Sequence, residues 1–149
     1  MSSQRRLGVK TTIKTHDAHV EPSVKDLGGW MISDLTIGYV SSEVVLGKTM
    51  KAMVGLTNLT SSDIKLHFKS AQKIRLRVTD STGTVVFETA EDTSTNPTDE
   101  TISATKGAYW SESIVLTPDK FKVGSAYFID GLLVSTTYPG VARVAFTVS

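Results

Sequence analysis

Apolar and polar side chains alternate along most of the chain after residue 30. A period of two is typical of β-strands that bury one face against a core. No stretch has the periodicity of a convincing helix. The pattern predicts an all-β fold, an antiparallel sandwich of two sheets with about 7–9 strands. The predicted strands lie at 31–40, 49–57, 63–68, 73–79, 84–89, 110–116, 126–135 and 141–148.

Two of these strands are predicted to form a hairpin around the turn Asp80-Ser81-Thr82-Gly83. Gly83 supplies the positive φ that such turns commonly need at their last position. A four-residue loop would place apolar residues on one buried side and an opposite-charge pair on the other. In this register the opposed pairs are Thr79 with Thr84, Val78 with Val85, Leu76 with Phe87, and Arg75 with Glu88.

The segment before this hairpin, residues 63–68, is not expected to pair tightly with 73–79. That pairing would set like charges opposite one another, for example Lys65 opposite Arg77 and Lys69 opposite Lys73. We therefore expect Ser70-Ala71-Gln72 to carry the chain from one sheet to the other. Both segments then contribute apolar residues to one core, and their basic residues face solvent on opposite sides.

Residues 1–30 are polar and poorly periodic, and they are interpreted as an N-terminal arm or an extra strand; residues 31–149 are the sandwich domain. The segment "ETAEDTSTNPTDE", residues 88–100, carries five carboxylates and no cation. Asn96-Pro97 interrupts any continuous strand there. This acidic segment is predicted to be an exposed, mobile loop.

Composition excludes several classes of function. The net charge of +1 gives no general attraction to nucleic acid or to anionic membranes. The basic residues between 65 and 77 are divided between two faces and have no aromatic residues among them for base stacking. The chain has no cysteine, so disulfides and thiol catalysis are excluded. No apolar run is long enough for a signal peptide or a membrane span, so we expect a cytoplasmic protein that is made without export.

No motif in the sequence carries enzymatic chemistry. The histidines His16, His19 and His67 lack a spacing or a carboxylate partner that would favour a metal site. There is no G-x-S-x-G motif and no phosphate-binding loop. The sequon Asn58-Leu59-Thr60 is interpreted as a turn. We therefore predict a non-enzymatic protein without cofactor or metal.

Four aromatic residues at loops and strand ends are candidates for protein binding, because exposed aromatic side chains supply much of the energy of protein interfaces. The alternative for each is a lid over the core. In "GAYWSESIVLTP", alternation turns Trp110 and Glu112 inward, so we predict a partly buried Trp110 at the end of the core near the loops of 90–109, with Glu112 at the rim. The four candidates are Tyr109, Trp110, Phe121 and Tyr138.

The stretch from Leu56 to Glu88 resembles the BsuPI family, the intracellular proteinase inhibitors of bacilli and their relatives. The resemblance covers about residues 45–149, and its most specific part is the block Phe-x-Ser-x-Gln. Three features depart from the family: Ala71 replaces a glycine, Val123-Gly124 replaces Pro-Gly, and the acidic loop 90–100 differs. The residues on family positions are Asn58, Phe68, Ser70, Gln72, Asp80, Gly83, Phe87 and Tyr127.

The resemblance implies an immunoglobulin-like sandwich in which Gln72 and Asp80 satisfy backbone donors in turns. It also implies a protein-binding module that inhibits a proteinase through loops at one end, and the candidate segments are 104–110 and 117–125. The alternative is a structural subunit or decoration module of a larger assembly, such as a virion or filament. In that case residues 1–30 would join neighbouring subunits, as in a homo-oligomer.

Overall fold

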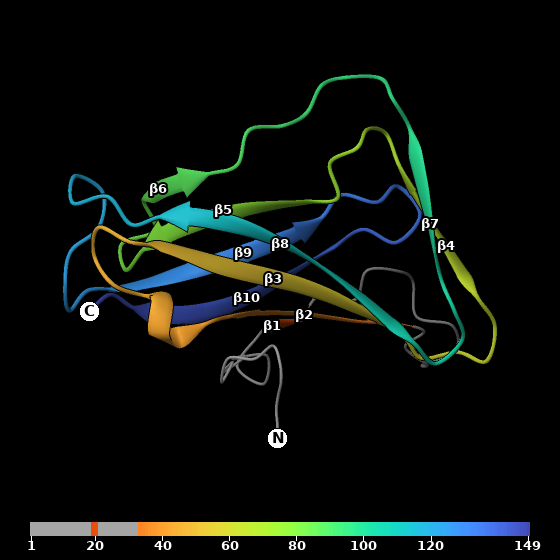
Figure 1. Cartoon of the computed structure of the whole chain (residues 1–149), viewed down its shortest axis with the longest axis horizontal. Coiled ribbons are helices and arrows are strands. Elements are labelled where there is room, and N and C mark those ends of the chain that lie inside the picture. The colour runs from red at the N-terminus through yellow and green to blue at the C-terminus, as the bar shows by residue number, and fades with distance from the viewer. Residues whose placement is uncertain (1–18, 21–32) are drawn as a thin grey trace.

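The computed structural model describes residues 19–20 and 33–149, and these form two packed β-sheets with a short ribbon across one end (Figure 1). The first sheet has the order β1-β10-β9-β5-β6, the second β2-β3-β8, and β4 pairs with β7 in the ribbon. All these pairs are antiparallel. The strands are β1 (His19–Val20), β2 (Ser33–Tyr39), β3 (Thr49–Asn58), β4 (Ile64–Phe68), β5 (Ile74–Asp80), β6 (Val85–Glu88), β7 (Thr98–Ile102), β8 (Gly107–Val115), β9 (Ala126–Leu133) and β10 (Gly140–Thr147).

This architecture confirms the predicted all-β sandwich. The two-residue strand β1 lies within the predicted arm and pairs with β10, while the rest of residues 1–30 lies outside the described part of the chain. Among the described residues the helical structure is limited to the short 3₁₀ turn Ser41–Glu43. None of these residues therefore belongs to a helix that could cross a membrane.

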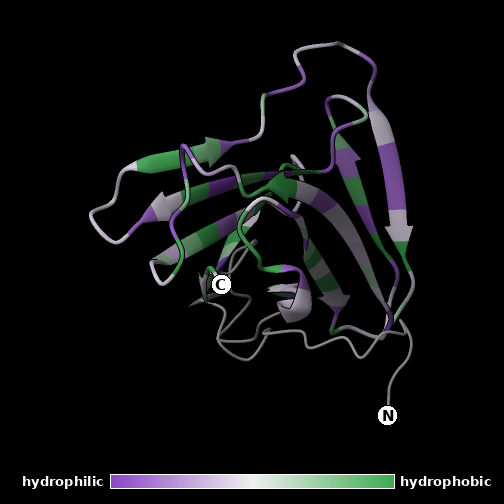
Figure 2. Cartoon of the chain, turned by 60° about the vertical axis from the view of Figure 1, so that its left-hand side comes forward, coloured by the Kyte–Doolittle hydropathy of each residue, from purple (hydrophilic) through white to green (hydrophobic). Residues whose placement is uncertain are grey.

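Hydrophobic and hydrophilic residues alternate along the strands (Figure 2), and the apolar ones are buried in a core between the two large sheets. The start of β9 is anchored by Tyr127, whose hydroxyl accepts a hydrogen bond from the Lys122 backbone N–H at 2.8 Å. Its ring stacks on Phe146 with centroids 5.5 Å apart. A tyrosine at this place that bonds back to the preceding loop is a hallmark of immunoglobulin-like sandwiches.

The predicted crossover between the sheets is confirmed. β4 and β5 do not pair with each other, and the chain passes from the ribbon to the five-stranded sheet through residues 69–73. Phe68 and Leu76 are both fully buried in the shared core. The like-charge argument therefore identified the correct topology.

The predicted register of the β5–β6 hairpin was wrong. Asp80, rather than Thr79, pairs with Thr84, because the Asp80 carboxylate accepts hydrogen bonds from the N–H groups of Thr82 and Thr84 and closes a shorter loop. A bulge between Val78 and Thr79 then shifts the strand. As a result Arg77 pairs with Glu88 in place of Arg75.

The acidic segment was only partly predicted. Residues 90–97 are exposed and outside any strand, as expected. Residues Thr98–Ile102, however, form β7, which pairs with β4 along its whole length. Asp99 and Glu100 disfavour a strand in "TDETI", but the two threonines and Ile102 favour one, and the segment becomes a strand because β4 offers a backbone edge and Ile102 is buried against the core.

Candidate functional site

The β4–β7 ribbon crosses one end of the sandwich, which we call the ribbon end (Figure 1). β4 buries Ile64, Leu66 and Phe68 and exposes the residues between them. On the exposed face the His67 ring nitrogen Nδ1 lies 2.6 Å from Oδ1 of Asp99 across the strand pair. The ribbon therefore has an apolar face on the core and a polar face in solvent.

A partly buried cation, Lys73, joins the ribbon to the rest of the sandwich. The Lys73 ammonium donates a hydrogen bond to Oγ1 of Thr98 at 2.6 Å and lies 3.4 Å from a carboxylate oxygen of Glu100. It also lies 4.3 Å above the centre of the Phe68 ring. The same Glu100 oxygen accepts a hydrogen bond from the Trp110 indole at 3.2 Å. Lys73 and Glu100 thus connect β4, β5, β7 and β8 at this end.

Residues 89–97 form an arch from β6 to β7, and both of its ends are fixed (Figure 1). The Gln72 side chain accepts a hydrogen bond from Asp92 N–H and donates one to the Ala90 carbonyl. Arg75 donates to the Thr89 carbonyl at the first end. At the second end the Thr98 hydroxyl donates to the Ser70 carbonyl at 2.9 Å. The crossover between the sheets therefore holds both ends of the arch.

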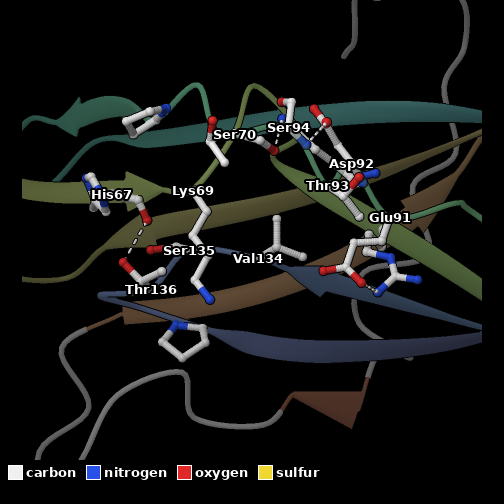
Figure 3. Close-up of a pocket in the computed structure, with 15 residues that line it drawn as sticks. His67, Lys69, Ser70, Glu91, Asp92, Thr93, Ser94, Val134, Ser135 and Thr136 are labelled. Carbon is white, nitrogen blue, oxygen red and sulfur yellow. Dashed lines mark hydrogen bonds and ion pairs between the residues drawn. The ribbon is translucent and has the colours of Figure 1, made fainter.

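A cleft of about 770 Å³ lies between the arch, the crossover and the loop 134–139 (Figure 3). That loop is attached to β4, since the Thr136 N–H donates to the His67 carbonyl at 2.7 Å and Ser135 forms a β-bridge with Phe68. The cleft is lined by hydroxyl groups from Ser70, Ser135 and the arch, together with charged groups of both signs. Val134, Pro97 and Pro139 add apolar surface to its lining.

The cleft holds no nucleophile paired with a base among the described residues. The ring of His67 bonds to Asp99 and to no hydroxyl there. The Asp92 carboxylate accepts a hydrogen bond from the Ser94 N–H, which holds the pKa of Asp92 below its ordinary value. No three His, Asp or Glu residues in the described ranges lie close enough to hold a metal ion, and His16 lies outside those ranges. The arrangement provides a surface rich in charged and hydroxyl groups that is suited to binding.

Most of the described chain matches a known protein family. Residues 39–136 match the family model described as BsuPI, intracellular proteinase inhibitor. The chain belongs to the BsuPI family. The matched residues run from the end of β2 to the end of β9 and so include the whole ribbon, the crossover and the arch. None of the curated proteins compared with the chain matches it.

Solved structures similar to this BsuPI-family chain share little sequence with it. The C-terminal domain of wzt matches with a TM-score of 0.48 and 9% identity, over 89% of this chain and 77% of that one. β-Glucuronidase 2 of Bacteroides uniformis matches with a TM-score of 0.44 and 10% identity, over 89% of this chain. A β-glucosidase from Listeria innocua has a TM-score of 0.42 and 14% identity, over 78% of this chain. The chain spans 14% of the glucuronidase and 16% of the glucosidase.

The most specific BsuPI residues have clear structural roles here. Phe68 is fully buried under the Lys73 cation, and Ser70 is buried and accepts the Gln72 N–H through its hydroxyl. Gln72 then holds the arch through two hydrogen bonds. The expected roles of Gln72 and Asp80 in satisfying backbone donors are confirmed. The sequence did not reveal that the partners of Gln72 lie in the arch, because those partners are distant in the sequence.

The four aromatic candidates do not form one site. Tyr109 is 70% exposed on the outer face of the β2-β3-β8 sheet, whereas Trp110 is half-buried on the opposite face of β8. Trp110 is half-buried at the ribbon end, as predicted, and its ring packs edge-on against Phe68. Tyr138 is partly buried in the loop 134–139 and packs on the core. The interpretation of Phe121 as a surface aromatic was wrong, because it is 1% exposed and packs against Tyr127 at the opposite end.

Asn58 is also more than a turn residue. Its side chain is fully buried and donates hydrogen bonds to the carbonyls of Ser62, Ile102 and Ser103. Its amide oxygen accepts from the backbone and the hydroxyl of Thr60. These bonds fasten the far tip of the ribbon, so the sequon is closed to glycosylation in the folded chain.

Proposed function

We propose that this BsuPI-family chain inhibits a proteinase by presenting the arch, residues 89–97, to the substrate cleft of the enzyme. One observation carries the proposal: eight consecutive exposed residues, 90–97, are held at both ends by Ser70 and Gln72 of the family-specific block. The family model supports a proteinase as the partner.

The physical reason is preorganisation. A flexible loop loses conformational entropy when it binds, and a loop whose ends are already held in place avoids part of that cost. Cleavage within a fixed loop also leaves the two new ends held beside each other, so the products separate slowly. A segment of this kind occupies a cleft without being processed efficiently.

We propose the arch in place of the two segments expected from the sequence, 104–110 and 117–125. Segment 104–110 lies at the ribbon end, but its second half is the paired start of β8. Segment 117–125 lies at the opposite end and is anchored by the buried Phe121. The arch contributes Glu91 and Asp92, so it fits a cleft with neutral or basic side chains.

The test is a titration of serine proteinases of several specificities, including those of the source organism, with the purified full-length chain. We expect stoichiometric loss of hydrolysis of a small peptide substrate for at least one enzyme. Gln72→Ala removes two of the hydrogen bonds that hold the first end of the arch without changing any exposed arch residue, and it should weaken inhibition about tenfold or more. Asp80→Ala is the matched control, because it removes a similar turn-holding side chain from the other end of β5.

Two results would contradict the proposal. One is full activity of every proteinase at micromolar excess of the chain. The other is equal inhibition by the wild type and by a variant in which residues 91–95 are replaced with glycine and serine. In that second case the family function stands and the inhibitory surface lies elsewhere.

The second function considered from the sequence, a structural subunit joined through residues 1–30, stays a prediction. Most of those residues lie outside the described part of the chain. The described domain does, however, contain a surface that could accept such a segment.

A further inference from the structure

β8 is an edge strand with an open side. It pairs with β3 on one side and has no partner strand on the other among the described residues. Leu116 N–H donates to the Lys48 carbonyl and the Lys106 carbonyl accepts from Asn58 N–H, so the even-numbered residues of this strand bond to β3. The odd-numbered residues therefore point their backbone groups outward. Of these, Tyr109, Ser111 and Ser113 have no backbone partner in the described ranges.

This edge lacks the features that normally prevent pairing. Natural edge strands are usually short, bulged, or marked by lysine or proline. β8 has nine residues, a continuous register with β3, and neither lysine nor proline. Its one charged residue, Glu112, points toward the flank between the sheets. Such an edge is a ready template for an added strand.

A groove of about 290 Å³ runs along the same edge, between Trp110, Ser111 and Glu112 on β8 and residues 71–74 of the crossover and β5. Glu112 is half-buried there and makes no hydrogen bond or ion pair with any described residue. The neighbouring cation, Lys73, is already bonded to Thr98 and Glu100. The groove thus combines an uncompensated carboxylate with an indole ring, and both favour a cationic side chain.

We propose that the edge of β8 binds residues 5–14 of a second copy of this chain as an added strand. These residues, "RRLGVKTTIK", carry four cations and no carboxylate. Lys10 and Lys14 fall on one side of an extended strand, and Val9 and Ile13 fall on the other. The lysines then face Glu112 and Trp110, and the aliphatic residues lie beside Tyr109 and Val115, which are 70% and 51% exposed.

The reach of the chain favours a second copy over the same copy. β1 at His19 is three strands from β5 in its sheet, which is about 14 Å. β8 lies beside β5 in the other layer, about 10 Å further, so a surface path is about 24 Å. Five residues from Lys14 to His19 span at most about 18 Å. The length of this path therefore favours β8 of a second copy as the acceptor of the segment.

The experiment measures self-association of the full-length chain by sedimentation across the micromolar range, at low and high salt. We expect a salt-sensitive dimer or larger oligomer. Glu112→Lys should weaken association about tenfold or more, and Asp119→Lys is the matched control, with the same charge change in an exposed loop at the other end. Ser111→Pro removes an outward N–H that β3 does not use, so it should weaken association without breaking the β3–β8 pairing.

A reciprocal change sharpens the test. Lys10→Glu with Lys14→Glu should abolish association on its own and regain it when Glu112→Lys is added. A chain that is monomeric throughout overturns the proposal. The proposal is also overturned if Glu112→Lys associates as strongly as the wild type. This result counts even if Ser111→Pro does not fold. None of these outcomes depends on proteinase inhibition, so this proposal and the inhibitor proposal can fail separately.

Discussion

Trp110 tests whether the ribbon end is a partly open boundary of the core. Its ring packs edge-on against Phe68 with centroids 6.4 Å apart, and its indole N–H donates to Glu100. The side chain is half-buried. Trp110→Ala should therefore destabilise the fold by about 2 kcal/mol, within a range of about 1–3 kcal/mol.

The magnitude follows from the contacts that are lost. Replacing a fully buried aromatic residue with alanine costs about 3–5 kcal/mol, and half-burial reduces this to about 1.5 kcal/mol. The edge contact with Phe68 adds about 0.5 kcal/mol. The bond to Glu100 adds little, because the Glu100 side chain is 33% exposed and water replaces the indole.

Chemical denaturation at neutral pH measures this cost, and a fall in melting temperature of roughly 4–8 °C should accompany it. Tyr109→Ala is the matched control, since Tyr109 is adjacent on β8 but is exposed on the opposite face, and its removal should cost less than about 0.5 kcal/mol. Trp110→Phe should recover most of the loss. A cost of about 4 kcal/mol or more, which is within the range for a fully buried aromatic residue, would place Trp110 inside the core and refute the boundary argument. Equal costs for Trp110→Ala and Tyr109→Ala would refute it as well.

Two further predictions concern the scaffold. Gly131→Ala should lower the free energy of unfolding by about 1–3 kcal/mol in chemical denaturation, because a Cβ there would lie 2.5 Å from Val54 Cγ2 and 2.8 Å from Ile37 Cδ1. Val54→Ala removes the nearest of these atoms, so it should be less harmful in the Gly131→Ala background than in the wild type. Additive costs of the two substitutions would refute the clash. The pKa of Asp80 lies below its ordinary value of 3.8 because Thr82 and Thr84 donate hydrogen bonds to the carboxylate. Since the pKa is lowered in the folded state, this contribution is present above pH about 4 and is lost as the pH falls through the folded pKa. Melting temperatures of Asp80→Asn should therefore fall less than those of the wild type between about pH 4 and pH 2, and parallel curves would contradict this origin.

The sequence by itself determined most of the strands, the two-layer arrangement and the crossover, although it missed β7 and the register of the β5–β6 hairpin. Alternation fixes which face of each strand is apolar, and like charges excluded a β4–β5 hairpin. The same pattern placed Trp110 at the boundary of the core. The Phe-x-Ser-x-Gln block identified the family. These features are local, or depend on pairs of neighbouring segments, so a single sequence contains the information needed to predict them.

Tertiary structure alone decided the features that carry the proposals. "TDETI" carries two carboxylates after Asn96-Pro97, and it becomes β7 because it pairs with the edge of β4 and because Glu100 forms an ion pair with Lys73. Phe121 sits in a turn of the sequence, yet it is buried because Tyr127 and the end of the core lie beneath it. Gln72 and the arch it holds are 18 to 20 residues apart. Such contacts depend on where separate strands pack, as does the free edge of β8, since β7 pairs with β4 and β8 pairs only with β3 among the described strands.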